Sequence, residues 1–281
     1  MTRLPPFMLY WAAVPAVVLS VWFLHIAEAP RSVLTLQILA ASFATVVFVV
    51  LVRMRRVSPS VNIHWFALAL TLSLFLPLLA GSGGGTERWL VLGSIRLYVA
   101  PVVLPVAVFF LGAPLRVPAI YAASVIAAAI ALVLQPDASQ LSAFALAMLV
   151  LVTALRSYLS LRVALLAVLL SCAVVAWQTP DPLAPVRYVE GVFDLAADVS
   201  AFALLAALIS AVLPVIALVW VVRGTSSSNG GLAVGTYYAS LLALAPLQVT
   251  PVPLLGFGAG SILGYFLVAG VISRARANHA A

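Results

Sequence analysis

Two polar stretches in an otherwise apolar chain hold the residue types that could do chemistry. The first, GGGTERWLVLG at residues 83–93, places Glu87, Arg88 and Trp89 directly after a run of glycines. A guanidinium binds phosphate through two parallel hydrogen bonds, and glycines let backbone amides approach the same anion. The stretch therefore predicts a site for an anionic group such as a lipid phosphate. The alternative is an interfacial loop with solvated charges and a tryptophan in the aromatic belt.

The second stretch, QTPDPLAPVRYVEGVFDLAAD at residues 178–198, is rich in acids. At a helical period its apolar residues share one stripe. The acids that lie roughly on another stripe are Glu190, Asp194 and Asp198. One of them could act as a general base, because apolar surroundings would raise the pKa of its carboxyl group. A simple interfacial helix with solvated acids explains the same pattern.

The composition predicts the elements that must carry these stretches. Of the 281 residues, 65% are hydrophobic and 7% are charged, and the mean hydropathy is +1.23. Soluble domains carry about 25% charged residues. A membrane-spanning helix needs about 20 apolar residues, and such segments recur along the whole chain. We therefore expect an all-α, polytopic integral membrane protein that forms a single membrane domain.

Ten apolar segments are expected to span the membrane. They cover residues 7–27, 33–52, 63–80, 97–112, 117–134, 139–155, 162–178, 199–222, 231–249 and 252–272. The pattern leaves long outer loops at 81–96 and 178–198, a cytoplasmic linker at 224–231 and a disordered tail after Arg274.

The charges sort across this arrangement. With both termini in the cytoplasm, ten arginines fall on the inner side and four on the outer side, as the positive-inside rule requires. All seven acids fall outside. The arginines lie at segment ends and the chain has no lysine, which argues against nucleic-acid binding. The charges therefore predict a multi-pass membrane protein with both termini in the cytoplasm.

The sequence gives no sign of a cofactor. His25, His64 and His279 are scattered and Cys172 stands alone, so no metal-ligand cluster is expected, and a divalent cation is not indicated. A phosphate-binding loop with its lysine and a Gly-x-Ser-x-Gly nucleophile elbow are both missing from the sequence.

Several short stretches resemble one family. They are GTERWLVLG at 85–93, LQPD at 134–137, DPL at 181–183, TPVPL at 250–254 and GFGAGS at 256–261. In this order they resemble outer-face motifs of the SEDS family (shape, elongation, division and sporulation), the ten-span peptidoglycan polymerases of rod elongation and septation. The chain departs from the family after Gly93, where Q-P-S-E-x-x-K is replaced at Tyr98, Pro101 and Leu104. It also lacks P-E-x-H-T-D before the eighth span.

The resemblance implies a glycosyl transfer between lipid-linked disaccharides at the outer face of the cytoplasmic (inner) membrane of a bacterium. Asp198 is the nearest match to the family's catalytic aspartate, with Asp194 or Glu190 as alternatives. Arg88 and Arg187 would hold the diphosphate of the polyprenyl-linked sugar. The other residues expected at the substrate are Glu87, Trp89, Asp137, Asp181 and Ser261. The implied partners are membrane lipid and a single-span transpeptidase (a class B penicillin-binding protein).

Two other functions remain open. Because the chain is short and lacks the Q-P-S-E-x-x-K and P-E-x-H-T-D stretches, it could be an inactive family relative. Such a relative would act as a scaffold or regulator of a cell-wall synthesis complex. A lipid or solute transporter is the third possibility, because small-residue stretches such as residues 122–131 permit close helix packing. Against transport, no charge lies inside the predicted spans, where ion-coupled transporters usually carry one.

Overall fold

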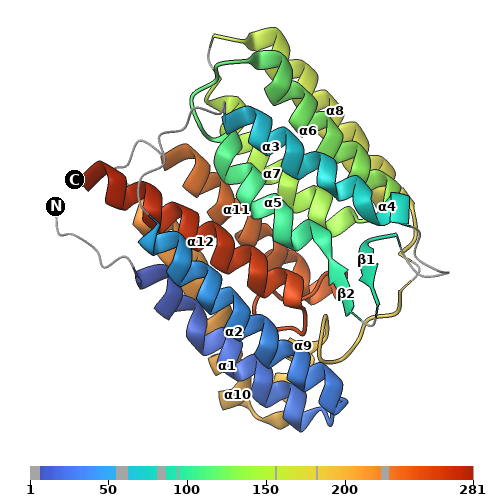
Figure 1. Ribbon diagram of the computed structural model, residues 1–281. Helices are drawn as coiled ribbons and strands as arrows, with labels where there is room; N and C mark the ends of the chain where they lie inside the picture. Colours follow the sequence, from blue (N-terminus) through green and yellow to red (C-terminus); the bar gives the residue numbers. More distant parts are fainter. Residues whose placement is uncertain are drawn as a thin grey trace. The chain divides into compact units, whose positions relative to one another are not determined.

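The computed structural model describes residues 7–54, 63–80, 87–93, 95–155, 157–181, 183–222 and 228–280, which are mostly helical (Figure 1). The chain divides into two compact units. Unit 1 consists of Met1–Arg56, Pro185–Thr225 and Leu241–Ala281, and unit 2 consists of Val57–Ala184 and Ser226–Ser240.

Unit 1 is built from helices that lie far apart in the sequence. Its elements are α1 (Met8–Ile26), α2 (Arg31–Arg53), α9 (Val192–Val199), α10 (Ala201–Val222), the 3-10 turn η2 (Ala245–Leu247), α12 (Ala259–Ala280) and the end of α11 (Ser228–Leu244). Helix α2 packs along α12, and α1 packs along α10 (Figure 1). The short helix α9 packs on α10 and buries Val192, Leu195 and Ala196 in a core with Phe23.

A glycine allows α12 to approach α2 closely. A Cβ at Gly270 would lie 3.0 Å from Leu51 Cδ1 and 3.5 Å from the backbone of Phe48. The ring of Phe48 is fully buried and meets the rings of Tyr10 and Phe266. Small and aromatic side chains therefore set this contact, as expected for helices packed in a bilayer.

Unit 2 contains the middle of the chain. Its elements are α3 (Ile63–Leu72), η1 (Ser73–Phe75), α4 (Leu76–Ala80), β1 (Trp89–Leu92), β2 (Ile95–Tyr98), α5 (Val99–Leu111), α6 (Pro118–Leu134), α7 (Ala138–Thr153), α8 (Leu159–Gln178) and α11 as far as Ser240. Helix α3 packs on α5 and α6, and α8 packs on α6 and α7.

The outer loop expected at 81–96 contains an antiparallel β-hairpin. Trp89 pairs with Tyr98 and Leu92 pairs with Ile95. Gly93 follows β1 with φ +64°, a left-handed conformation that favours glycine. The hairpin differs from the predicted loop because WLVL and IRLY are apolar strand formers on either side of a turn residue. Residues 83–86 of the glycine run lie outside the described residues.

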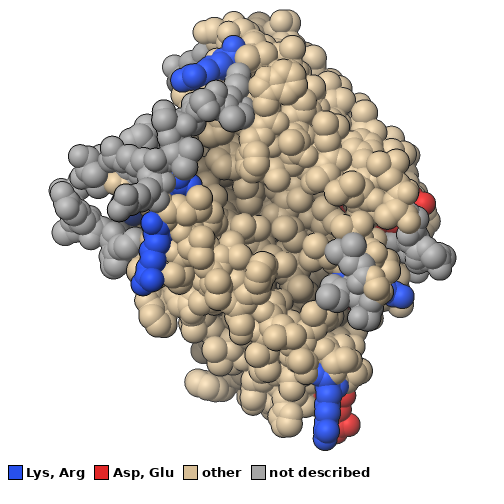
Figure 2. All heavy atoms as spheres, in the orientation of Figure 1, with Lys and Arg blue, Asp and Glu red and all other residues tan. Residues whose placement is uncertain are grey.

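The helices suit a lipid solvent. Among the described residues, six helices are long and apolar enough to cross a membrane, and α5, α6 and α7 are shorter apolar helices. Large apolar side chains such as Phe202, Leu170 and Leu79 are exposed, as lipid-facing residues would be. Figure 2 shows a mostly uncharged surface with charged side chains in only a few places. The protein is a polytopic all-α membrane protein, and the number of ten spans stays a prediction.

Several boundaries differ from those predicted, most of all around α9, α11 and α12. Helix α12 begins at Ala259 and not at residue 252, because the prolines and glycines of the preceding stretch form turns. The helix also continues through the predicted disordered tail to Ala280. Helix α11 begins at Ser228, inside the predicted linker, whose residues 224–227 lie outside the described residues. Helix α9 lies inside the predicted loop 178–198 and is separated from α10 by the extended backbone of Ser200.

Two glycines bring α5 and α11 together in unit 2. A Cβ at Gly112 would lie 2.2 Å from Gly230 Cα, and a Cβ at Gly230 would lie 2.5 Å from the carbonyl oxygen of Phe109. Both distances are too short for real atoms, and both involve backbone, which cannot rotate away. The two helices can therefore meet only where neither residue has a side chain.

We expect Gly230→Ala to destabilise the protein by about 1–3 kcal/mol, because the added methyl group forces the two helix ends apart. The measurement is unfolding of the detergent-solubilised protein by heat or by SDS. Gly258→Ala is the matched control, since its Cβ would meet nothing closer than Ser261 Oγ at 4.0 Å. Equal stability of the two variants would contradict the steric account.

Candidate functional site

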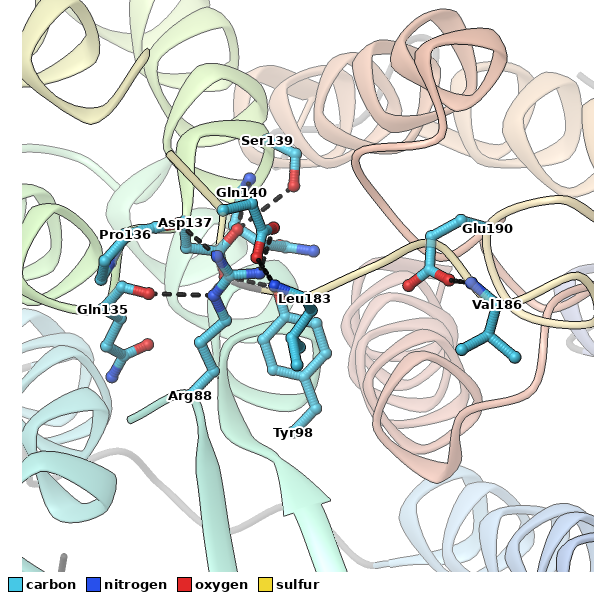
Figure 3. Close-up of polar contacts among 11 residues, drawn as sticks. Arg88, Tyr98, Gln135, Pro136, Asp137, Ser139, Gln140, Leu183, Val186 and Glu190 are labelled. Atoms are coloured by element: carbon cyan, nitrogen blue, oxygen red, sulfur yellow. Dashed lines mark hydrogen bonds and ion pairs between the residues drawn. The ribbon is translucent and has the colours of Figure 1, made fainter. Parts of the chain in front are cut away.

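Arg88 is buried at the start of β1 and donates to protein acceptors through all three nitrogens. Its Nε donates to the carbonyl oxygen of Gln135 at 2.9 Å, and one terminal nitrogen donates to the carbonyl oxygen of Pro136. The other terminal nitrogen contacts Asp181 Oδ2 at 2.8 Å. The two carbonyls lie just beyond the end of α6, where a helix leaves acceptors unsatisfied. Arg88 thus ties the hairpin to the α6–α7 turn (Figure 3) and, through the ion pair, to Asp181.

Asp137, in the same turn, is 1% exposed and has its acceptors filled. Tyr98 donates its hydroxyl to Oδ2, while Ser139 Oγ and the N–H of Gln140 donate to Oδ1 at 3.2 Å each. The last bond makes Asp137 the N-cap of α7, which satisfies one of the free N–H groups of the helix. Figure 3 shows Tyr98 reaching this carboxylate from the end of β2.

The network extends from this carboxylate into the packed helices of unit 2. Tyr237 on α11 donates its hydroxyl to the side-chain oxygen of Gln140, and both residues are buried. The side-chain amide of Gln135 donates to the carbonyl oxygen of Leu74. On the open side, Asp181 accepts the N–H of Leu183 at 3.0 Å. Pro182, within the DPL stretch, lies outside the described residues.

Burial and charge act in opposite directions on this pair. Burial raises the pKa of Asp137 above its ordinary value, although the nearby Arg88 cation and the hydrogen bonds lower it. Burial lowers the pKa of Arg88, but Asp137, Tyr98 and Asp181 together raise it, and the net change is upward. The arginine is therefore charged, and its charge stabilises the buried carboxylate.

In unit 1 the acidic stretch forms a tight turn before α9. The carbonyl oxygen of Val186 accepts the N–H groups of Val189, Glu190 and Gly191. The Glu190 carboxylate closes the turn by accepting the N–H of Val186 at 2.8 Å. We call residues 186–191 the outer turn.

The outer turn is bonded to the loop that precedes α12. The N–H of Val252 donates to Val189 and the N–H of Phe257 donates to Tyr188, at 3.3 and 2.9 Å. A Cβ at Gly256 would lie 2.2 Å from the Val189 carbonyl oxygen, so this approach requires glycine. The GFG stretch of the sequence therefore supports the outer turn.

The two acids of α9 are exposed. Asp198 forms an ion pair with Arg187 at 2.5 Å, and their side chains are 64% and 60% exposed. Asp194 accepts a hydrogen bond from the side-chain amide of Gln248. The expectation that a base in this stretch faces apolar surroundings is not met within the protein, because α9 turns its apolar face inward and both aspartates outward.

The remaining predicted site residues fall in different settings. Glu87 is exposed, Trp89 is half-buried against the ring of Tyr98, and Ser261 is buried in the first turn of α12. The structure brings Arg88, Asp137 and Asp181 together in unit 2. In unit 1 it pairs Arg187 with Asp198, whereas Glu190 and Asp194 bond to Val186 and Gln248. Among the described residues, no group of three His, Cys, Asp or Glu could hold a metal ion.

Sequence reasoning missed the polar partners of Asp137. In the sequence Tyr98 stands out only as a substituted family position, and Ser139 and Gln140 do not stand out at all. The available signal was LQPDASQ at residues 134–140, a dense polar cluster between two apolar helices. Polar residues in such a place usually satisfy one another when they are buried.

We expect Arg88→Gln to destabilise the protein by about 3–5 kcal/mol, since it leaves the Asp137 carboxylate buried beside no cation. Arg96→Gln is the control, because Arg96 lies exposed on β2 of the same hairpin and should change stability by less than about 0.5 kcal/mol. The measurement is SDS unfolding of both variants in detergent. Similar stabilities would refute a structural role for Arg88.

The raised pKa of Asp137 predicts a pH dependence. The folded protein holds this proton more tightly than the unfolded chain, so the linked stability is complete below the unfolded pKa of 3.8 and is lost as the pH rises through the folded pKa. Arg88→Gln removes the cation that lowers this pKa, so the loss on raising the pH should become larger. Thermal unfolding between about pH 5 and about pH 8 tests this. Adding Asp137→Asn should abolish the extra loss; an unchanged slope would assign it to another group.

Solved structures, rather than sequence matches, place the chain among known proteins. No protein-family model and no curated protein matches the sequence. The rod shape determining protein RodA of Thermus thermophilus matches with a TM-score of 0.65 and 18% identity, over 96% of each chain. An Asp→Ala variant of that RodA gives the same TM-score and identity over 96% of this chain and 97% of the other. A chain from a study of the structural coordination of polymerization and crosslinking by a peptidoglycan synthase complex gives 0.66 and 18%, over 96% and 97%. The protein described here therefore has a fold similar to that of the rod shape determining protein RodA.

Proposed function

We propose that the protein is a peptidoglycan glycosyltransferase that polymerises a lipid-linked disaccharide of the lipid II type at the outer face of the cytoplasmic membrane, in cell elongation or division. One observation carries the proposal. A RodA-like fold covers 96% of the chain, and it presents an exposed carboxylate and an exposed guanidinium side by side on α9 and the outer turn.

The proposed reaction needs a base and a cation. The 4-hydroxyl of one sugar attacks the anomeric carbon of the growing chain, the bond from that carbon to the diphosphate breaks, and polyprenyl diphosphate leaves. Asp198 accepts the hydroxyl proton as general base. Arg187 binds the diphosphate, whose charge grows as the bond breaks. Both side chains are exposed and stand on a firmly bonded backbone, which suits binding from outside.

The proposal gives Arg88 a positioning role in addition to any contact with a head group. Three of its five N–H groups donate to acceptors within the described residues of unit 2. Its buried side chain holds Asp181 and the α6–α7 turn in place. Glu87 and Trp89 flank it in the chain and complete the proposed substrate contacts of the hairpin. Ser261 supplies the proposed contact of α12.

A second candidate function has support from the same site. The buried network of Arg88 and Asp137 is already satisfied within the protein, as in a structural element that stabilises a scaffold. A non-catalytic relative would hold a partner such as a single-span transpeptidase in a cell-wall synthesis complex. Both functions place the protein in the cytoplasmic membrane with its termini in the cytoplasm.

We expect Asp198→Asn to lower glycan synthesis by about 10²- to 10⁴-fold, the usual contribution of a general base. The assay follows polymerisation of fluorescent lipid-linked disaccharide by the purified protein, with and without a co-purified transpeptidase. Glu28→Gln is the control, since Glu28 is an exposed acid outside the proposed site. Product that survives Asp198→Asn would move the base to Asp194, Glu190 or Asp181. No product from folded wild-type protein in either condition would favour the scaffold.

A further inference from the structure

Arg187 stands on an anchored backbone. The residues that follow it in the outer turn donate three N–H groups to the Val186 carbonyl oxygen, and Tyr188 and Val189 accept N–H groups from the loop before α12. A Cβ at Gly191 would lie 3.2 Å from Arg187 Cα, so the turn is also closely packed at this point. The mobile part of Arg187 is therefore its side chain alone.

Asp198 also stands on an anchored element. Helix α9 buries Val192, Leu195 and Ala196 against the core of unit 1, which fixes the helix and leaves the carboxylate on its outer face. Within unit 1 a single contact, the 2.5 Å ion pair, joins Arg187 and Asp198 across eleven residues of sequence. Both side chains are more than half exposed, and ion pairs in such settings contribute little stability. The pair can therefore separate without moving the backbone on either side.

We infer that Arg187 and Asp198 form a displaceable pair, in which the diphosphate of a lipid-linked sugar takes the guanidinium and so frees the carboxylate. This inference rests on the proposed function and adds to it the order of events. Before substrate binds, Asp198 Oδ2 accepts the Arg187 hydrogen bond. After the diphosphate binds, that oxygen is open to a sugar hydroxyl.

The chemistry of the two anions favours the exchange. A diphosphate offers several charged oxygens and can accept two parallel hydrogen bonds from a guanidinium. The carboxylate of Asp198 receives one hydrogen bond from Arg187. Asp198 therefore acts as an internal competitor for Arg187, and a neutral polyprenol, which has no phosphate, should leave the pair closed.

Binding of undecaprenyl diphosphate to the full-length protein in nanodiscs tests the inference by a double-mutant cycle. Arg187→Gln should weaken binding about tenfold or more, since a charged hydrogen-bond donor is lost. Asp198→Asn should tighten binding about threefold, since the internal competitor is lost. In the Arg187→Gln background, Asp198→Asn should have no effect. Arg31→Gln, which changes an exposed arginine of α2 outside the site, and undecaprenol are the controls.

The outcomes separate the possible readings. If Asp198→Asn tightens binding equally in both backgrounds, general repulsion between acid and phosphate explains the effect and the displaceable pair is refuted. If neither single variant changes affinity, the pair is a surface contact only and the inference fails. Competition by inorganic pyrophosphate would show that the diphosphate alone opens the pair. A requirement for the lipid chain would show that the protein binds both the diphosphate and the polyprenyl chain.

This test does not depend on turnover. Coupling without glycan product would support the displaceable pair and reject the polymerase, whereas product without coupling would keep the polymerase and reject the pair. Thermal unfolding of every variant guards against misfolding. Arg187→Lys, which keeps the charge but not the two parallel donors, should bind with intermediate affinity, and wild-type affinity in this variant would argue against recognition by the guanidinium.

Discussion

The burial of one guanidinium is the constraint on which the rest of unit 2 depends. A buried cation must have its N–H donors hydrogen-bonded, and this requires acceptors that have no other donor nearby. Arg88 meets both conditions, because the carbonyls of Gln135 and Pro136 lie beyond the end of α6, where no intrahelical donor is available. The Arg88 side chain therefore donates to the carbonyls at the end of α6, stabilises the charge of the Asp137 carboxylate and holds the β-hairpin in place.

Unit 1 handles its polar groups in the opposite way. Asp194 and Asp198 are kept at the surface, and the outer turn is held to the loop before α12 by backbone hydrogen bonds. Gly256 makes this possible, since any side chain there would collide with the Val189 carbonyl. Exposed side chains with no structural role can change partners when a ligand binds, whereas the buried partners of Arg88 cannot.

Much of the helical framework follows from the sequence, because a lipid solvent leaves few choices. Apolar runs of sufficient length must be helical so that their backbone polar groups are satisfied. Apolar stretches mislead this prediction where they form turns or a strand and not a helix. Residues 251–258 are mostly apolar but contain Pro251, Pro253 and two glycines, and they form turns. The strand WLVL at residues 89–92 is too short and too uniformly apolar to show the alternation of apolar and polar residues that predicts a strand.

The candidate site was less accessible to sequence reasoning. The residue types were recognised, but which charges are buried depends on contacts between distant positions. Arg88 and Asp181 are 93 residues apart, and Tyr98 and Asp137 are 39 apart. No local pattern encodes such pairings. The outward direction of Asp198 was partly foreseeable, because the apolar stripe of α9 predicts the side it buries.

The discontinuity of unit 1 has a consequence for biogenesis. Helix α2 ends at Arg53, but the helix with which it packs most extensively, α12, begins at Ala259. A ribosome adds residues one at a time from the N-terminus, so α2 enters the bilayer long before that partner exists. Throughout synthesis of the intervening chain, lipid or an assisting protein must cover the face that Gly270 later occupies. A helix that is made late thus completes the packing of a helix that is inserted early.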